Sequence, residues 1–310
     1  MIEVRNVSKR YGRHQALDNI SFKVKKGDIL GFLGPNGAGK STTMNIITGY
    51  ISCDSGEVLI DGKNILDEPK EAKSRIGYLP EIPPLYNEMT VRKYLEFMFR
   101  LKRIKLPMDE HISKICTDLS IDDVGERIIN HLSKGYRQRI GLAQALLGDP
   151  PVLILDEPSV GLDPAQIIEM RSLIRKLGEN HTVILSSHVL TEIQAVCDNI
   201  VMINNGKIAA AGSIDHLMGT GRDTTIVRII IEGREQGIMS ALKGIDGIIR
   251  VTSLGETERG CYEFRIESKK DIRRAVSRAV ARTDYAIMLM QPAGQSLEDI
   301  YLEIISGNNN

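Results

Sequence analysis

A nine-residue segment rich in glycine, GPNGAGKST at residues 34–42, constrains the fold of this chain more than any other stretch. It fits the pattern G-x-x-x-x-G-K-[ST] and lies between an apolar run, ILGFLG, and a stretch of helical character, TTMNIITGY. That context predicts a strand, a tight loop and a helix whose N-terminus faces a phosphate group. The segment comprises Gly34, Pro35, Asn36, Gly37, Ala38, Gly39, Lys40, Ser41 and Thr42.

The residue types in this segment suit the binding of a nucleoside triphosphate. Glycines let backbone N–H groups face a common centre, Lys40 can reach the terminal phosphates, and the Ser41 hydroxyl can bind Mg²⁺. The sequence has no Asn-Lys-x-Asp motif for guanine recognition, so we expect ATP rather than GTP. Tyr11 precedes the segment and could stack on adenine, although packing alone is the alternative role of a tyrosine at the end of a strand. The predicted cofactors are ATP and Mg²⁺.

Two adjacent carboxylates end the apolar run VLILDEP at residues 152–158. Successive side chains of a strand point to opposite faces, so Asp156 and Glu157 are predicted to have different roles. Phosphoryl transfer to water needs one carboxylate near Mg²⁺ and another group that orients or deprotonates the water. We assign Asp156 to the metal and Glu157 to the water; two acids that merely solvate a strand end are the alternative.

One histidine occupies a position where ligands of α/β proteins bind. His188 follows the apolar run TVILSS, at the carboxyl end of a predicted strand, and we expect it to contact the terminal phosphate. The remaining histidines are expected on the surface: His14, His111, His131, His181 and His216.

The hydrophobic pattern predicts an α/β core. Residues 29–34, 152–156 and 182–187 are apolar runs typical of parallel strands covered on both faces by helices. Residues 2–24 and 57–66 predict an antiparallel layer, with Asp61-Gly62 as a two-residue hairpin turn. A helical pattern, beginning at Thr90 as N-cap, extends over about 87–147 and is predicted to be an insertion.

The end of the chain is predicted to form a smaller domain. The small and polar residues at 219–223 read as a linker between a domain at 1–218 and another at 224–310. In the second domain the expected order is strand, helix, strand, strand, helix, strand, the order of the ferredoxin-like split βαβ fold. Its basic stretch RRAVSRAVAR is interpreted as the solvated face of an amphipathic helix rather than as a nucleic-acid site.

Composition excludes several classes of protein. Forty basic and forty acidic residues leave no positive surplus for nucleic acid or for a membrane surface. Four widely spaced cysteines match no metal or redox pattern, and we expect buried, reduced thiols and a cytoplasmic location. No apolar run approaches the ~18 residues of a membrane span. Any role at a membrane would therefore require a partner.

The motifs together resemble those of the ATP-binding subunits of ABC transporters. They occur in one order through residues 1 to about 218: Tyr11, GPNGAGKST, GYLPE, LSKGY, VLILDEP, SVGLD and SSH. The sequences of these motifs are most similar to those of drug-resistance, gliding-motility and polysaccharide-type exporter cassettes, whose permease is a separate chain. The resemblance implies a P-loop NTPase fold, ATP hydrolysis, and a homodimer that drives a membrane permease from its cytoplasmic face, with no nucleic-acid partner.

The resemblance also implies that each site is shared between two copies. Ser133 and Gly135 are implied to form the signature loop, which caps a helix from about Tyr136 to Leu147 and faces a phosphate in the opposite subunit. A two-fold dimer would then contain two composite sites. Asp163 in SVGLD is implied to link these two sites across the dimer.

Three residues depart from the usual family pattern. Glu81 stands where Gln is typical, and the resemblance implies a role in binding Mg²⁺ and sensing the permease; a solvated loop acid is the alternative. Lys134 and Tyr136 stand where Gly and Gln are common, and they place a cation and a phenol near the γ-phosphate. Because a second inward cation would require compensation, we expect Lys134 to point outward.

Two alternative functions stay open. One is an ABC-type ATPase that acts on ribosomes or DNA without a permease, although such proteins commonly carry two cassettes or a long coiled-coil insertion. The other makes the C-terminal domain a ligand sensor that controls the motor. The transported substrate is not specified by this chain, because the translocation path would lie in another polypeptide.

Overall fold

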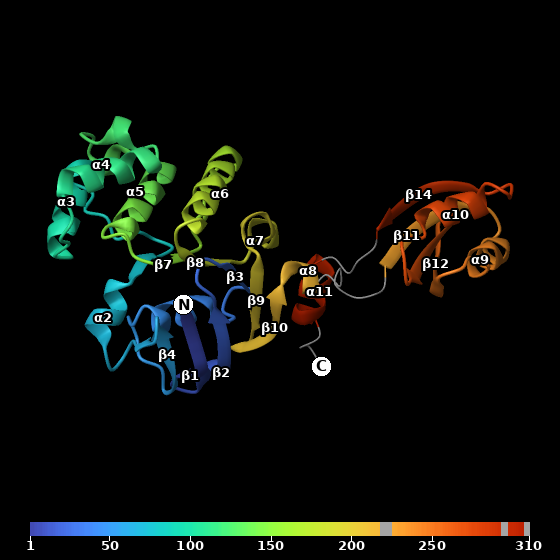
Figure 1. The fold of residues 1–310 in the computed structure, drawn as a ribbon, viewed down its shortest axis with the longest axis horizontal. Helices are drawn as coiled ribbons and strands as arrows, with labels where there is room; N and C mark the ends of the chain where they lie inside the picture. The colour runs from blue at the N-terminus through green and yellow to red at the C-terminus, as the bar shows by residue number, and fades with distance from the viewer. Residues whose placement is uncertain (218–224, 293–296, 307–310) are drawn as a thin grey trace. The chain divides into compact units, whose positions relative to one another are not determined.

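The structure, a computed structural model, describes residues 1–217, 225–292 and 297–306. The chain divides into two compact units, Met1–Gly212 and Ser213–Asn310 (Figure 1). The linker predicted at 219–223 lies outside the described residues. The division into domains at 1–218 and 224–310 stays a prediction.

A four-stranded antiparallel sheet forms one layer of the first unit. Its order is β2-β1-β4-β5, and its strands are β1 (Ile2–Tyr11), β2 (His14–Val24), β4 (Ser55–Ile60) and β5 (Lys63–Asn64). Asp61 and Gly62 join β4 to β5 with φ values of 49° and 80°. Positive φ at both central residues is the requirement of a tight hairpin turn, which confirms the predicted antiparallel layer and its turn.

A six-stranded sheet forms the α/β core. Its order is β10-β9-β3-β8-β7-β6, and its strands are β3 (Ile29–Leu33), β6 (Ile76–Leu79), β7 (Val152–Asp156), β8 (Thr182–Ser187), β9 (Asn199–Asn204) and β10 (Lys207–Ser213). Every residue of β3, β7 and β8 is buried, and these strands pair in parallel. This confirms the expectation from their continuous apolar runs. It also brings the carboxyl ends of the three strands to one edge.

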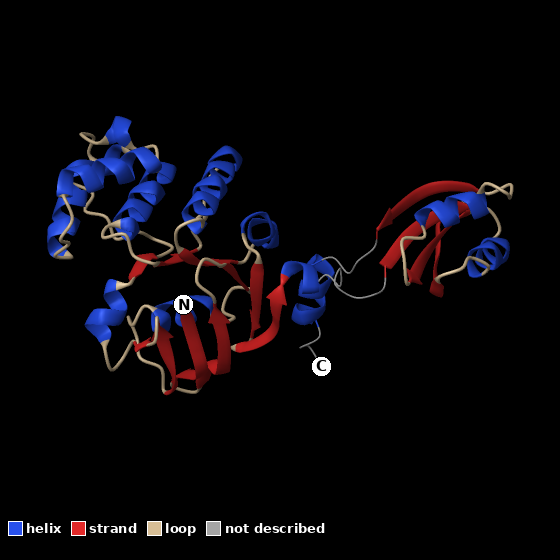
Figure 2. Ribbon diagram, viewed as in Figure 1, coloured by secondary structure: helices blue, strands red, loops and turns tan. Residues whose placement is uncertain are grey.

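Helices surround this sheet, and those between β6 and β7 form the predicted insertion. Those of the first unit are α1 (Lys40–Ile47), α2 (Pro69–Ser74), α3 (Val91–Leu101), α4 (Met108–Asp118), α5 (Lys134–Leu146), α6 (Pro164–Gly178) and α7 (Leu190–Val196). The Thr90 hydroxyl accepts a hydrogen bond from the Lys93 N–H, as expected of an N-cap. Figure 2 shows α3, α4 and α5 gathered together, away from the antiparallel sheet.

The second unit contains a four-stranded sheet of order β12-β13-β11-β14. Its elements are α8 (Ile214–Leu217), β11 (Thr225–Glu232), α9 (Glu235–Lys243), β12 (Ile248–Glu258), β13 (Cys261–Ser268), α10 (Arg273–Val280), β14 (Ala286–Pro292) and α11 (Leu297–Ser306). From β11 to β14 the order is strand, helix, strand, strand, helix, strand, as expected from the sequence. The assignment to the ferredoxin-like fold stays a prediction.

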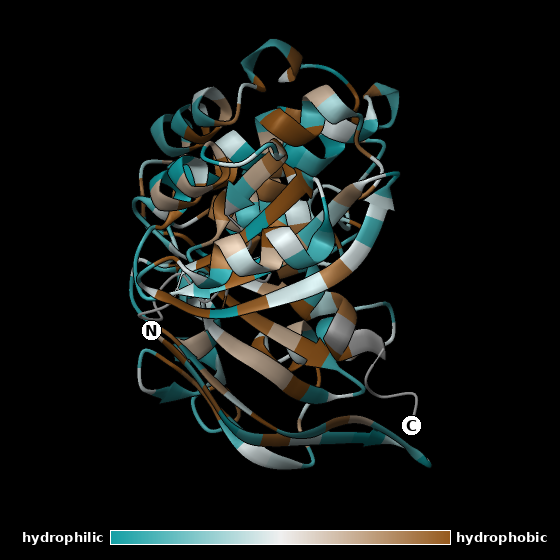
Figure 3. Ribbon diagram, turned by 90° about the vertical axis from the view of Figure 1, so that its right-hand side faces the viewer, coloured by the Kyte–Doolittle hydropathy of each residue, from teal (hydrophilic) through white to brown (hydrophobic). Residues whose placement is uncertain are grey.

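The basic helix of the second unit is amphipathic. α10 buries Val276 and Val280, whereas Arg273, Arg274 and Arg278 are exposed. Figure 3 shows hydrophobic and hydrophilic segments on the same helices, as amphipathic helices require. The arginines therefore form the solvated face predicted for this stretch.

Several smaller features complete the fold. All four cysteines are free thiols. The expectation that they are buried is confirmed for Cys116, Cys197 and Cys261 but is wrong for Cys53, which is partly exposed. Within the described ranges, no helix combines the length and the apolar character needed to cross a membrane. The surface prediction for His181 is wrong: its ring is buried, with Nδ1 2.8 Å from the Pro150 carbonyl oxygen.

Candidate functional site

The glycine-rich loop connects β3 to α1, and close packing fixes its path. A β-carbon at Gly34 would overlap the carbonyl oxygen of Ile203 in β9, so only glycine fits there. Gly39, the residue before α1, has a φ of 110°, which glycine adopts readily. Lys40 and Ser41 then begin the helix, so their side chains lie at its N-terminus as predicted.

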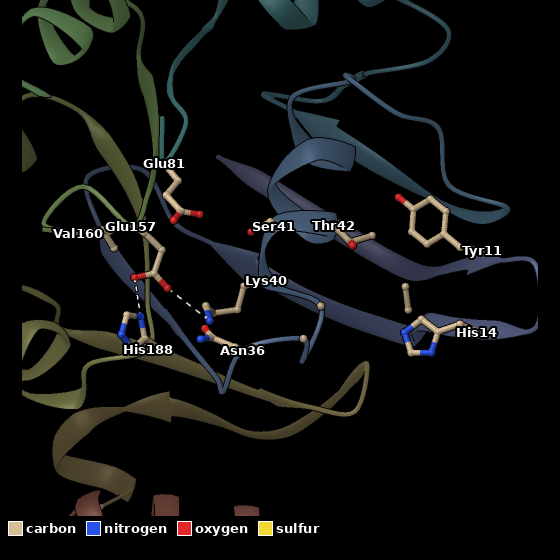
Figure 4. A pocket seen from close by; sticks show the side chains of 13 residues that line it. Tyr11, His14, Asn36, Lys40, Ser41, Thr42, Glu81, Glu157, Val160 and His188 are labelled. Carbon is tan, nitrogen blue, oxygen red and sulfur yellow. Dashed lines mark hydrogen bonds and ion pairs between the residues drawn. The ribbon is translucent and has the colours of Figure 1, made fainter. Parts of the chain in front are cut away.

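This loop borders a cavity with a volume of about 490 Å³. The cavity is lined by Tyr11, His14, Ala16, Asn36, Gly37, Gly39, Lys40, Ser41, Thr42, Glu81, Glu157, Val160 and His188. Tyr11 and His14 lie at the opposite end from Glu157 and His188 (Figure 4). The structure therefore brings together Tyr11, the phosphate-loop residues, Glu81, Glu157 and His188, which the sequence had placed in one site.

A buried network joins the loop lysine to Glu157. Lys40 is only 6% exposed, and its Nζ donates to the carbonyl oxygens of Gly34 at 2.8 Å and Pro35 at 3.3 Å. The same Nζ lies 3.4 Å from Oε1 of Glu157, and Oε2 of Glu157 lies 2.9 Å from Nδ1 of His188. Both contacts are drawn in Figure 4. Glu157 is thus held between an ammonium group and an imidazole.

The backbone at Glu157 leaves the strand conformation. Its φ is 49°, in the left-handed region that residues with a β-carbon seldom occupy. Its N–H donates to both the carbonyl oxygen of Ser186, at 3.2 Å, and the Ser186 hydroxyl, at 3.1 Å. This turn directs Glu157 into the cavity, whereas Asp156 is the last residue of β7. The two carboxylates therefore occupy different surroundings.

Asp156 is buried beside two serine hydroxyl groups. Its carboxylate accepts a hydrogen bond from the Ser186 hydroxyl, and the Ser41 hydroxyl lies close enough to lower its pKa. Burial raises the pKa of Asp156, the charges of Glu157 and Glu81 raise it further, and the hydroxyl hydrogen bonds oppose these effects. A nearby cation would favour the ionised form of this carboxylate.

The oxygen atoms at this end of the cavity fit Mg²⁺. Asp156, Ser41 and Glu81 offer two carboxylates and a hydroxyl, which are hard ligands of the kind that Mg²⁺ prefers. Within the described residues, no group of three or more His, Cys, Asp or Glu side chains could hold a metal. Besides Asp156 and Glu81, the ion would therefore need the Ser41 hydroxyl and oxygens from the nucleotide or water as ligands.

The residues implied to act in the opposite subunit cap two helices outside this cavity. The Ser133 hydroxyl accepts from the Tyr136 N–H at 3.4 Å, so α5 begins at Lys134, slightly before the expected start. Asp163 accepts from the Gln166 N–H at 2.9 Å and caps α6. Gly135 is buried against the Gln166 side chain. Their roles in a second copy stay predictions.

The two unusual residues beside Ser133 take different directions. The Tyr136 hydroxyl donates to Asp123 at 2.9 Å, so this phenol is engaged within the helical insertion. The Lys134 side chain is exposed and its Nζ occupies the space that a β-carbon of Gly161 would fill. Gly161 has a φ of 70° and belongs to the SVGLD segment.

Sequence reasoning missed two polar residues of the site. Ser186 was read only as part of an apolar strand, yet it contacts both Asp156 and Glu157; the two serines that end TVILSS were the available signal. His14 is exposed as expected, but it also lines the cavity, because the hairpin between β1 and β2 pairs it with Tyr11.

Comparisons with known proteins place these features in a family. The sequence model of the ABC transporter family matches residues 17–160. The bacitracin transport ATP-binding protein BcrA of Bacillus licheniformis is 33% identical over 299 residues, covering 94% of this chain and 97% of BcrA. The linearmycin resistance ATP-binding protein LnrL of Bacillus subtilis is 34% identical over 256 residues, covering 81% of this chain and 82% of LnrL.

Solved structures give the same result for the fold. An ATP-binding subunit of an ABC transporter is 29% identical with a TM-score of 0.64, covering 71% of this chain and 92% of that chain. A dimeric, post-hydrolysis state of the ATP-binding cassette MJ0796, bound to ADP and Pi, is 26% identical with a TM-score of 0.63. That alignment covers 69% of this chain and 98% of the cassette.

Proposed function

The chain belongs to the family of ABC transporter ATP-binding proteins, and from that premise we propose that two copies close around ATP to drive a separate membrane permease. ATP binding and hydrolysis are the activities of this family, and the cassette MJ0796 has been captured as a dimer with ADP and Pi. The proposal adds that the present chain pairs with its own second copy.

The observation that carries the proposal is the position of Glu157. Its carboxylate lies 3.4 Å from the Lys40 ammonium and 2.9 Å from the His188 ring, at the border of the phosphate-loop cavity. A carboxylate in this place can orient a water molecule toward the terminal phosphate and accept its proton. Phosphate binding would also draw Lys40 toward the nucleotide and release Glu157 for that role.

The other residues of the cavity stabilise charge and orientation. Lys40 and the loop N–H groups would neutralise the charge that develops on the phosphates. Asp156, Ser41 and Glu81 would hold Mg²⁺, which supplies further positive charge at the phosphates. His188 would contact the terminal phosphate, and Tyr11 would stack on the adenine from the opposite end.

We assign a second set of residues to the site of the opposite copy. Ser133 caps α5 and lies outside the cavity of its own chain, so it is free to present the start of that helix to a phosphate. Gly135 belongs to the same turn, and Asp163 caps α6 nearby in the sequence. Together they would complete the neighbouring site in a two-fold dimer.

The direction of transport is proposed from the relatives. The names of BcrA and LnrL refer to bacitracin transport and linearmycin resistance. We therefore propose that this chain powers an exporter and works at the inner face of the membrane, attached to its permease. The matched length of BcrA includes most of the second unit of this chain.

The central test replaces the carboxylate by its amide. Glu157→Gln is expected to retain ATP binding and to lower the rate of phosphate release at least ~100-fold, since the water loses its base. Nucleotide binding and phosphate release would be measured on the same preparation. Glu126→Gln, at an exposed acid elsewhere on the chain, is the control. Full turnover by Glu157→Gln would refute the assignment.

A further inference from the structure

A second cavity, with a volume of about 400 Å³, adjoins the nucleotide cavity. It lies between the loop that follows β6 and the start of α5, which contributes Lys134, Arg137 and Gln138. Glu81 and Val160 line both cavities, so the two meet there. We call this second cavity the α5 pocket. Its volume lies within the range of sites for small molecules.

Two positively charged side chains line the α5 pocket. Lys134 is the first residue of α5 and Arg137 lies one turn further along, so the two are neighbours on the surface of the helix. Among the residues that the structure describes, neither side chain has an ion-pair or hydrogen-bond partner. Glu81 is the only acid among the lining residues of the pocket, all of which the structure describes. The pocket therefore carries one excess positive charge.

A buried amide adds an unsatisfied acceptor to the same wall. Gln138 is only 1% exposed, and its Nε2 donates to the carbonyl oxygen of Glu81 at 3.2 Å. Its Oε1 is buried and has no hydrogen-bond partner in the described part of the chain. Buried polar atoms without a partner are rare, because each costs free energy. Since the bond from Nε2 fixes the orientation of the amide, Oε1 needs a donor from outside the chain.

The other large side chains of the α5 pocket are apolar. They belong to Ile82, Pro83, Leu85 and Val160. The Ile82 side chain is 82% exposed, so this chain leaves it uncovered. An apolar group bound in the pocket would be stabilised by removing such surface from water.

We propose that the α5 pocket binds a small carboxylic acid that carries an amide N–H and an apolar group, the chemistry of an N-acyl amino acid. Its carboxylate would lie between Lys134 and Arg137, where one negative charge matches the excess positive charge. Its N–H would donate to Oε1 of Gln138, and its apolar group would cover Ile82. A phosphate monoester fits less well, because Glu81 would repel its second negative charge.

The test measures the binding of a probe to the full chain without nucleotide. The probe is N-acetyl-para-fluoro-L-phenylalanine, and its dissociation constant is followed by fluorine NMR. A value on the order of 1 mM is expected for a molecule of this size. Arg137→Gln should raise the constant about tenfold, because it removes a charged donor. Lys134→Gln should raise it about threefold, because this ammonium is exposed and screened.

Arg100→Gln provides a matched control. Arg100 is an exposed arginine of α3, in the same helical insertion but outside the α5 pocket. Its replacement should change the dissociation constant of the probe less than about twofold. Equal effects of Arg100→Gln and Arg137→Gln, or no saturable binding to the parent, would overturn the inference.

Three relatives of the probe test the contacts without altering the protein. The carboxamide of the probe should bind about tenfold more weakly, because it lacks the charge. An ester with oxygen in place of the N–H should bind about fivefold more weakly, because Oε1 of Gln138 then lacks a donor. Para-fluorophenyl phosphate should also bind more weakly than the probe. Binding of any of the three as tight as that of the probe would overturn the assigned chemistry.

Lys40→Gln separates the α5 pocket from the nucleotide cavity. An anion bound in the nucleotide cavity would depend on the Lys40 ammonium, which the α5 pocket does not include. The dissociation constant of the probe should therefore stay within about twofold of the parent value, with the fold checked by far-ultraviolet circular dichroism. A loss of affinity as large as that caused by Arg137→Gln would place the probe in the nucleotide cavity and overturn the inference.

Discussion

Ser186 offers the sharpest test of how the site is built. Its hydroxyl is completely buried, donates to the Asp156 carboxylate and accepts from the Glu157 N–H at 3.1 Å. Ser186→Ala removes both contacts, but the Glu157 N–H keeps the Ser186 carbonyl oxygen at 3.2 Å. The principal loss is therefore the hydrogen bond to the buried carboxylate, and it should destabilise the protein by about 2 kcal/mol.

The same substitution should weaken the metal site. Asp156 would lose the donor that fixes its orientation, and the Mg²⁺ concentration for half-maximal ATPase activity should rise about tenfold. Stability would be measured by urea unfolding, followed by far-ultraviolet circular dichroism without nucleotide. The ATPase rate would be titrated with Mg²⁺ at saturating ATP.

Ser187→Ala supplies the comparison. Ser187 is equally buried and donates to the Glu192 carboxylate at 2.9 Å, outside the phosphate-loop cavity. It should cost similar stability and leave the Mg²⁺ dependence of activity within about twofold of the parent. If Ser186→Ala lost less than about 0.5 kcal/mol, or if both variants changed the Mg²⁺ dependence equally, the reasoning would be wrong.

Two further predictions concern packing and pH. Gly34→Ala should destabilise the first unit by at least ~2 kcal/mol in urea unfolding, because its β-carbon would overlap the Ile203 carbonyl oxygen; an unfolding midpoint equal to that of the parent would contradict this. Asp156→Asn should be more stable than the parent at pH 8 without nucleotide and Mg²⁺. Because the pKa of Asp156 is raised in the folded state, the folded parent binds more protons than its unfolded chain. The difference in stability between the variant and the parent should therefore shrink as the pH falls toward about 4. A stability difference that is independent of pH would exclude this explanation.

Much of the fold followed from local patterns. The apolar runs predicted β3, β7 and β8 because parallel strands between helices bury every side chain. Asp61-Gly62 predicted a hairpin because few other pairs accept two positive φ values. The sequence reasoning did not identify β9 or β10. β9 pairs in parallel with β3, which is distant in the sequence, and β10, at the edge of the sheet beside β9, alternates intermediate and exposed residues.

The site was less accessible from sequence than the fold. The order of the motifs located Lys40, Glu157 and His188, which the structure brings within hydrogen-bonding or ion-pairing distance of one another through Glu157. The role of Ser186 was not predicted, because a buried serine in an apolar run has no characteristic spacing from the other residues of the site. The direction of Tyr136 depends on Asp123, which only the folded helical insertion brings within reach.

The left-handed turn at Glu157 has a consequence for local stability. The β-carbon that carries the carboxylate is what makes this backbone conformation unfavourable, so the chemistry and the strain come from the same residue. The hydrogen bonds from its N–H to Ser186 hold the turn against that tendency. The residue that would act on a phosphate is thus held in a strained backbone conformation, and its hydrogen bonds to β8 keep it there.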